Sequence, residues 1–187
     1  MESDRTALLV MDVQDGVVQR LGSPEMLGRT AAAIAAARGA GVRVIYVQVG
    51  FRPGYPEISA RNRTFSGLAQ SGQFVEREVS IHESVAPLDG ETVVTKRRVS
   101  AFAGSDLDVV LRAGGIVSLV LTGIATSGVV LSTLRQAADL DFDLIVLSDA
   151  CADGDDDVHR VLTEKVFPRQ ALVTTVAEWA AGLGASA

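Results

Sequence analysis

The stretch LVLTGIATSGVVLSTLRQAAD, residues 119–139, carries a strand, a tight turn and a helix in one segment. The apolar, β-rich residues 117–121 favour a buried strand, which a Thr-Gly pair interrupts. From Val129 onward apolar residues recur at helical spacing, as they do on the buried face of a helix. Such a turn presents backbone N–H groups and the positive end of a helix dipole at the mouth of a parallel sheet. We therefore expect residues 123–128 to lie at the reaction centre.

The rest of the chain alternates strands with helices. Apolar runs rich in β-branched residues predict six strands, at residues 7–11, 42–49, 91–95, 117–121, 142–147 and 171–174. Capping residues predict helices that begin after Ser23, Ser105 and Thr175. The alternation predicts a three-layer α/β/α, Rossmann-like fold with a parallel sheet, and one domain over residues 1–187. Functional residues are then expected at the carboxyl ends of the strands.

Composition excludes several classes of function. The chain has 187 residues, 48% of them hydrophobic, and a net charge of −6 without a basic stripe, which argues against nucleic acid as a partner. We find neither a signal peptide nor a membrane anchor, so we expect a cytoplasmic protein without membrane contact. The single cysteine, Cys151, has no internal partner, and we interpret it as a small buried residue.

One long segment, residues 50–73, is predicted to be irregular. It contains the aromatic residues Phe51, Tyr55 and Phe65, which together with Phe102 are candidates for gating a pocket. A loop of this length in a compact domain is usually functional, and this one is interpreted as a lid or part of a subunit interface. The alternative is a surface excursion with scattered aromatic residues.

Two polar features point away from a metal site. Residues 153–157 carry four aspartates at the expected start of a helix, where negative charge complements the helix dipole, and we interpret them as capping residues. The two histidines, His82 and His159, lie far apart, each on a predicted helix. A metal would require a tighter group of ligands, and no phosphate-binding or dinucleotide motif is present. We therefore expect neither a metal nor a cofactor.

Three segments together resemble the isochorismatase-like hydrolases, the superfamily that also contains nicotinamidases and N-carbamoyl amidases. They are GIATSGVVLST in the central turn, LLVMDVQDG around Asp12, and TKRRVSAF around Lys96. The resemblance covers nearly the whole chain in the right order. It implies a six-stranded sheet of order 3-2-1-4-5-6, a small-molecule substrate, and assembly as a homodimer or homotetramer. In that order the strands that lead to Asp12 and to the turn lie side by side.

The resemblance also defines the position that decides the chemistry. In the amidases the turn holds a nucleophilic cysteine, and the corresponding residue here is Val129. Isochorismatases also lack that cysteine and usually have glycine there. The family further implies a cis peptide between Ile124 and Ala125, with the N–H groups of Ala125 and Val129 as candidate oxyanion donors. Valine cannot attack a carbonyl carbon, so no thioester can form at this position.

Asp12 and Lys96 are the candidate catalytic residues. Asp12 is interpreted as a carboxyl group that transfers a proton. Burial is expected to raise its pKa, and Lys96 is expected to lower it. The alternative is a residue that only caps a loop. Lys96 is interpreted as an ammonium that stabilises negative charge, the alternative being a solvated member of a basic triplet. At normal strand spacing it ends about 10 Å from the first strand, so it can belong to the site only if the chain after Thr95 leans back over the sheet. Arg97 and its neighbour Arg98 point opposite ways, so at most one is expected to face the site.

Two functions remain open. The first is a cysteine-independent hydrolase that acts on a small anionic metabolite, in which Asp12 protonates the substrate and Lys96 stabilises its charge. The second is an inactive relative of the amidases that binds a small molecule or a protein partner. The residues expected to bind substrate are Gln14, Phe51, Phe65, Ala125, Gly128 and Val129.

Overall fold

The computed structural model describes residues 2–75 and 79–184 and contains one six-stranded sheet. All neighbouring strands are parallel, in the order β3-β2-β1-β4-β5-β6, which confirms the predicted fold and strand order. The strands are β1 (Thr6–Met11), β2 (Arg43–Val49), β3 (Thr92–Lys96), β4 (Ser118–Ile124), β5 (Asp143–Ala152) and β6 (Leu172–Thr174).

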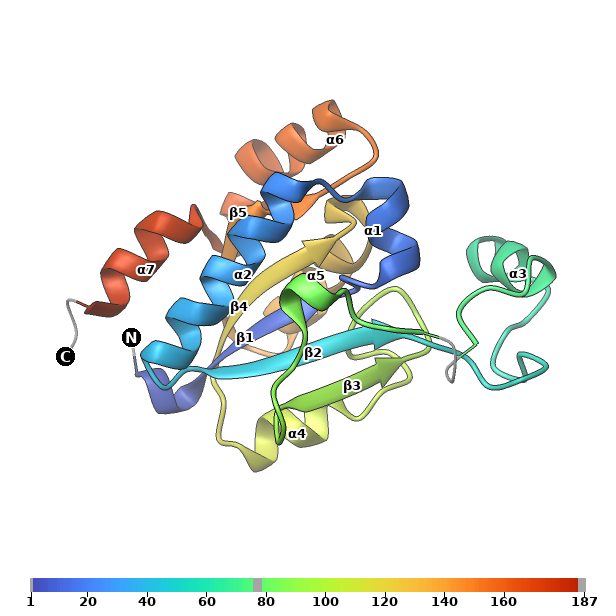
Figure 1. The fold of residues 1–187 in the computed structure, drawn as a ribbon, viewed down its shortest axis with the longest axis horizontal. Helices are drawn as coiled ribbons and strands as arrows, with labels where there is room; N and C mark the ends of the chain where they lie inside the picture. Colours follow the sequence, from blue (N-terminus) through green and yellow to red (C-terminus); the bar gives the residue numbers. More distant parts are fainter. Residues whose placement is uncertain (1, 76–78, 185–187) are drawn as a thin grey trace.

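Helices follow most of the strands and cover both faces of the sheet (Figure 1). The α-helices are α1 (Asp15–Leu21), α2 (Pro24–Gly39), α3 (Arg63–Gln70), α4 (Leu107–Ala113), α5 (Leu131–Asp139), α6 (Asp156–Val161) and α7 (Val176–Gly184). Short 3₁₀ turns lie at η1 (Ser3–Arg5), η3 (Glu83–Val85) and η6 (Phe167–Arg169), and single π-helical turns at η4 (Thr126–Val130) and η5 (Leu162–Val166). Within the described ranges, no helix is long and apolar enough to span a bilayer.

The core has two layers because successive side chains of a strand point to opposite faces. In β1, Leu9 and Met11 join the cluster that packs under α4 and α5. The alternate residues Leu8 and Val10 join the cluster under α1, α2 and α7. All six residues of β1 are buried, so this strand lies at the centre of both layers.

Three segments differ in more than a terminal residue from the sequence prediction. β4 continues through the expected break at the Thr-Gly pair to Ile124, because Gly123 keeps pairing with Met11 of β1. β5 continues to Ala152 after a register shift opposite β4, so the residues expected to follow the strand belong to it. Residues 50–73 are not wholly irregular, since they contain α3, which Figure 1 shows beyond the carboxyl ends of β2 and β3.

The predicted caps are largely confirmed. The Ser23 hydroxyl accepts a hydrogen bond from the Met26 N–H at 3.1 Å at the start of α2. The Thr175 hydroxyl accepts one from the Glu178 N–H at 3.3 Å at the start of α7. The α4 helix begins one residue later than expected, at Leu107, whose N–H donates to the Ser105 hydroxyl at 3.3 Å.

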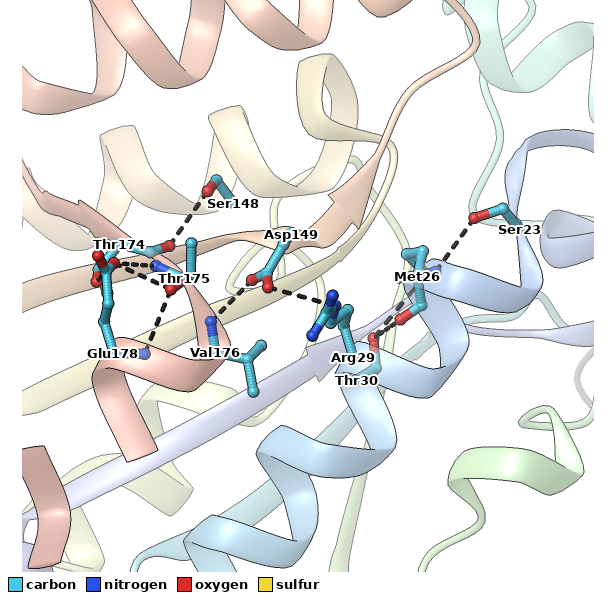
Figure 2. A network of polar contacts seen from close by, with 10 residues as sticks. All are labelled: Ser23, Met26, Arg29, Thr30, Ser148, Asp149, Thr174, Thr175, Val176 and Glu178. Atoms are coloured by element: carbon cyan, nitrogen blue, oxygen red, sulfur yellow. Dashed lines mark hydrogen bonds and ion pairs between the residues drawn. The ribbon is translucent and has the colours of Figure 1, made fainter. Parts of the chain in front are cut away.

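Asp149 connects three elements at the carboxyl half of β5, as Figure 2 shows. One carboxylate oxygen accepts a hydrogen bond of 2.8 Å from the N–H of Val176, the first residue of α7. The other lies 3.7 Å from Nε of Arg29 in α2. A carboxylate at a helix N-terminus is stabilised by the dipole as well as by the hydrogen bond. Asp149 therefore ties α2 and α7, which cover the same face of the sheet, to β5.

Gly123 is required where β1 and β4 approach each other. Its φ angle is +140°, and a Cβ added there would lie 2.2 Å from the Met11 carbonyl oxygen. Both the backbone conformation and the space therefore exclude a side chain at this position.

We expect Gly123→Ala to lower the free energy of unfolding by about 2–5 kcal/mol, because it adds both overpacking and backbone strain. Gly28→Ala in α2 is the matched control, since its added Cβ would meet nothing within 4 Å. This control is expected to stabilise the fold by about 0.5–1 kcal/mol. Urea unfolding of both variants measures the difference, and equal effects would contradict the packing argument.

Candidate functional site

Asp12 is the first residue after β1. Its φ angle is +56°, in the left-handed region that Asp tolerates better than most side chains. Its N–H donates a hydrogen bond of 2.8 Å to the Val47 carbonyl oxygen of β2. The backbone therefore turns sharply at the end of the strand and is held there by its neighbour.

Lys96 forms a buried ion pair with this aspartate. Its Nζ lies 2.9 Å from Oδ2 of Asp12, and the two side chains are 3% and 10% exposed. Nζ also donates a hydrogen bond of 3.0 Å to the Arg98 carbonyl oxygen. Lys96 is still paired with Val49 in the sheet and yet reaches Asp12, so the condition that the chain must lean back after Thr95 is wrong. The long side chain, rather than the backbone, spans the end of β2.

The two oxygens of the Asp12 carboxyl have different surroundings. Oδ2 faces the ammonium, whereas Oδ1 is buried and has no hydrogen-bond partner among residues 2–75 and 79–184. Burial raises the pKa of Asp12, and the charge and hydrogen bond of Lys96 oppose this shift without cancelling it. Such a carboxyl holds its proton to higher pH than an exposed aspartate does.

The central turn lies on the neighbouring strand. The peptide bond between Ile124 and Ala125 is cis, as the family resemblance implies, and the π-helical turn η4 then leads into α5. Val129 is 2% exposed and packs in the same apolar cluster as Met11, the residue before Asp12. The Gly128 N–H is bound to the Ala125 carbonyl oxygen at 3.1 Å. The position of the amidase thiol is thus filled by a buried apolar side chain.

Two residues that sequence analysis did not assign to the site bind the turn. The Ser127 N–H donates to Oδ2 of Asp153 at 2.6 Å, and the Thr126 hydroxyl lies 2.8 Å from Nδ1 of His159. Asp155 caps α6 as predicted, but Asp153 binds η4 instead. The signal that could have indicated Asp153 is its place directly after β5, the strand next to β4.

The histidines are confirmed in part. His159 lies on α6 as predicted, whereas His82 does not lie on a helix; it precedes the 3₁₀ turn η3 and caps it through Nδ1. Among the described residues, no three His, Cys, Asp or Glu side chains form a group that could hold a metal ion. Cys151 is buried as predicted, and burial raises the pKa of its thiol to about 12.

Gln14 lies beside the end of β2. Its amide nitrogen donates to the Val49 carbonyl oxygen at 3.0 Å, and its amide oxygen accepts from the Val49 N–H at 2.8 Å. The side chain therefore binds the β2 backbone in the same way as a neighbouring strand would.

The aromatic residues form two groups. Phe51 and Phe65 pack edge to face, with ring centroids 5.5 Å apart, in a small apolar cluster of their own. The Tyr55 hydroxyl donates to the Gln73 carbonyl oxygen at 3.0 Å, which links the beginning of the segment 50–73 to its end. Phe102 belongs to the main core and packs against Phe142 instead.

Arg97 and Arg98 both hold the loop that follows β2. Arg98 donates to the Glu57 carbonyl oxygen at 2.9 Å, and Nε of Arg97 lies 3.4 Å from the Glu57 carboxylate. Arg97 also donates to the Gly50 carbonyl oxygen at 2.6 Å. The basic triplet is therefore not a solvated surface run, since its three side chains bind Asp12, Gly50 and Glu57.

Four surface hollows of 360–390 Å³ lie on the described part of the chain. Asp12, Lys96 and Val129 line none of them. Gln14 lines the hollow beside α1, and Asp153 and His159 line one between α2 and α6.

Comparisons with known proteins identify the family. The family model described as the isochorismatase domain matches residues 6–178. The chain belongs to the isochorismatase family. Hydrolases are among its members, and this chain belongs to that hydrolase family.

Isochorismatase relatives match along most of the chain. The isochorismatase family protein YecD of Escherichia coli O157:H7 is 31% identical over 182 residues, which cover 95% of this chain and 96% of YecD. The ureidoacrylate amidohydrolase RutB of Methylorubrum extorquens is 32% identical over 174 residues, or 80% of this chain and 70% of RutB. A crystal structure of a cysteine hydrolase from Pseudomonas syringae pv. phaseolicola superposes with a TM-score of 0.92 at 25% identity, covering 100% of this chain and 96% of that one.

The raised pKa of Asp12 predicts how the stability of this isochorismatase-family chain depends on pH. The folded state binds the Asp12 proton more tightly than the unfolded state, so the contribution of this group is fully present below the unperturbed pKa of about 3.9. The contribution is lost as the pH rises from there through the raised pKa, by at most about 1.4 kcal/mol per pH unit.

The measurement is the free energy of unfolding against pH for the wild type and Asp12→Asn. Asparagine keeps the shape and tolerates the left-handed backbone. We expect the wild-type value minus the variant value to fall with rising pH over that interval. A difference that is constant or rises with pH would contradict the raised pKa.

Proposed function

We propose that this chain is a cysteine-independent hydrolase of the isochorismatase family that acts on a small anionic metabolite. Asp12 serves as the proton donor, and Lys96 is its electrostatic partner. The observation that carries the proposal is that the two oxygens of the Asp12 carboxyl group have different surroundings. Oδ2 lies beside the Lys96 ammonium. Oδ1 is buried and has no hydrogen-bond partner among residues 2–75 and 79–184. The pKa of the whole carboxyl group is raised. A general acid requires a protonated, unshared oxygen of this kind.

The proposed reaction is hydrolysis of an enol ether that carries a carboxylate. Asp12 transfers its proton to the terminal vinyl carbon, and the electron pair of the double bond forms the new C–H bond. Water adds to the resulting oxocarbenium ion and returns a proton to the Asp12 carboxylate. The hemiketal then breaks its C–O bond, which releases an alcohol and pyruvate. Lys96 keeps a positive charge beside the carboxylate that remains after the first transfer.

The charge around Asp12 supports an anionic substrate. Four cationic residues and two acidic ones are linked, in part through the main-chain carbonyl oxygens of Arg98 and Glu57: Arg52, Lys96, Arg97 and Arg98 with Asp12 and Glu57. This local excess of positive charge stands out in a chain whose net charge is −6. An anion approaching the site is therefore attracted by it.

The remaining site residues are assigned roles in the same proposal. The Ala125 and Val129 N–H groups stabilise negative charge at the turn, and Gly128 leaves space beside them. The Val129 side chain packs beneath the turn, in the apolar cluster that contains Met11. Gln14 holds the end of β2 in place through its two hydrogen bonds to Val49. Phe51 and Phe65 stabilise the segment that follows β2 by packing against each other.

We also propose that the protein works in the cytoplasm as a homodimer or homotetramer, without nucleic acid or membrane as a partner. The support is the family membership and the acidic composition. Sedimentation of the purified protein measures the assembly.

The direct test is pyruvate release from isochorismate by the wild type, Asp12→Asn and Asp108→Asn. Loss of a general acid lowers the rate by about 10²–10⁴-fold, so Asp12→Asn is expected to be inactive in practice. Asp108→Asn is the matched control, because Asp108 lies exposed on α4 and pairs only with Arg112 in the described contacts. Release that survives Asp12→Asn would remove Asp12 as the acid, and no release by the wild type would remove this substrate.

The second candidate is an inactive relative of the amidases that binds a ligand or partner without chemistry. The observation that favours it is Val129, which fills the thiol position with a buried side chain. Among the relatives is RutB, a ureidoacrylate amidohydrolase.

Val129→Cys distinguishes the two candidates from each other. If Asp12 and Lys96 retain their function, the variant is expected to gain hydrolysis of ureidoacrylate, because Asp12 accepts the thiol proton and Lys96 stabilises the thiolate. Val130→Cys is the control, since it places a thiol one residue further along in an equally buried position. The gain is expected to vanish in Val129→Cys/Asp12→Asn. A gain would show that Asp12 and Lys96 remain poised for a thiol, whereas a folded variant without activity would be less informative, because the pocket could have changed as well.

A further inference from the structure

The central turn is bound from the side opposite to Asp12. In the sheet β4 lies between β1, which leads to Asp12, and β5, which leads to Asp153. Asp153 accepts the Ser127 N–H at 2.6 Å, and Nδ1 of His159 lies 2.8 Å from the Thr126 hydroxyl. Two consecutive residues of η4 are thus each held by a side chain from the segment after β5.

The element that supplies these contacts is itself well anchored. Asp155 caps α6 by accepting from the N–H groups of Asp157 and Val158, at 2.9 and 3.2 Å. At the other end, the Thr163 hydroxyl donates to the His159 carbonyl oxygen at 2.9 Å. The imidazole therefore projects from a helix whose start is capped and which continues directly into η5.

The Thr126 partner of this contact is shielded from water, whereas His159 is half-buried. Thr126 is fully buried, whereas the neighbouring Ser127 is exposed. A hydrogen bond inside a protein is stronger than one that competes with water, and loss of one partner leaves the other unsatisfied. The pair of Thr126 and His159 therefore fixes the orientation of η4 more firmly than a surface contact would.

We propose that Asp153 and His159 are positioning residues for the candidate site. They hold Thr126 and Ser127, and through the same short turn they set the position of Val129 and of the Ala125 N–H. This inference rests on the proposed function, in which the turn binds the substrate's negative charge.

The contact of Asp153 also limits where that charge can lie. Its carboxylate already accepts the hydrogen bond of the Ser127 N–H in η4, the turn that continues into α5. A second anion at the same N–H would be repelled by the first. The substrate anion is therefore directed toward Lys96 and away from Ser127.

The test uses methyl NMR of Val129 in the full-length protein, a readout that does not depend on turnover. His159→Ala removes the imidazole, whereas His159→Asn keeps a polar atom close to the place of Nδ1. His159→Gln places its amide nearer to Nε2 and serves as the matched control. We expect the Val129 methyl resonances to move in His159→Ala and His159→Gln and to return toward the wild-type positions in His159→Asn. Thr126→Ser, which keeps the hydroxyl, is expected to resemble the wild type.

Asp153 provides a second set of variants should the His159 variants fail to fold. Asp153→Ala removes the acceptor for the Ser127 N–H, and Asp153→Asn restores a neutral acceptor. If isochorismate is turned over, kcat is expected to fall about threefold to tenfold in His159→Ala and Asp153→Ala, with KM within about twofold and rescue by the asparagine variants.

Unchanged Val129 resonances in both alanine variants would overturn the inference. So would shifts that the asparagine variants fail to reverse although their unfolding temperatures equal that of the wild type. If the wild type releases no pyruvate, the enol-ether substrate fails while the NMR result still decides the role of Asp153 and His159.

Discussion

The buried pair of Asp12 and Lys96 is the contact on which the arrangement of the candidate site depends. Burying either charge alone would cost several kcal/mol, about 3–5 when one partner of such a pair is removed. The two therefore constrain each other, and the side chains that join them cross the end of β2. The ion pair thereby fixes the positions of the carboxyl ends of β1, β2 and β3 relative to one another. A binding protein gains little stability from such a pair that apolar residues could not supply, which favours a chemical role.

Strand order explains why the turn belongs with this pair. β1 and β4 are neighbours although more than a hundred residues separate them, because the chain reverses direction across the sheet after the first three strands. The absence of a side chain at Gly123 allows the two strands to pair up to the point where both turn. The turn is then held between the β1 side and Asp153 on the β5 side. Its geometry is therefore set by the whole sheet rather than by its own sequence alone.

Sequence reasoning predicted what depends on local pattern and on strand ends. Asp12, Lys96 and the turn follow buried strands, and parallel strands place such residues at one edge. It did not predict the contact between Thr126 and His159, because 33 residues separate them and no periodicity relates their side chains. The role of Gln14 escaped for the same reason, since its amide replaces a strand partner that only the folded chain defines. α3 was missed because it is short and depends on contacts of Phe65 within its own small cluster.

The left-handed backbone of Asp12 has a consequence for how this position changes during evolution. At φ +56° glycine, asparagine and aspartate are accepted with little strain, whereas glutamate and most other residues are disfavoured. Glycine or asparagine at this position would fit the main chain but would leave the Lys96 ammonium buried without its charged partner. The buried Lys96 thus requires a negative charge at this position, while the main chain limits the length of the side chain that carries it. For this reason, the distance from the main chain at which a carboxyl group can lie here is set by the backbone at the end of β1.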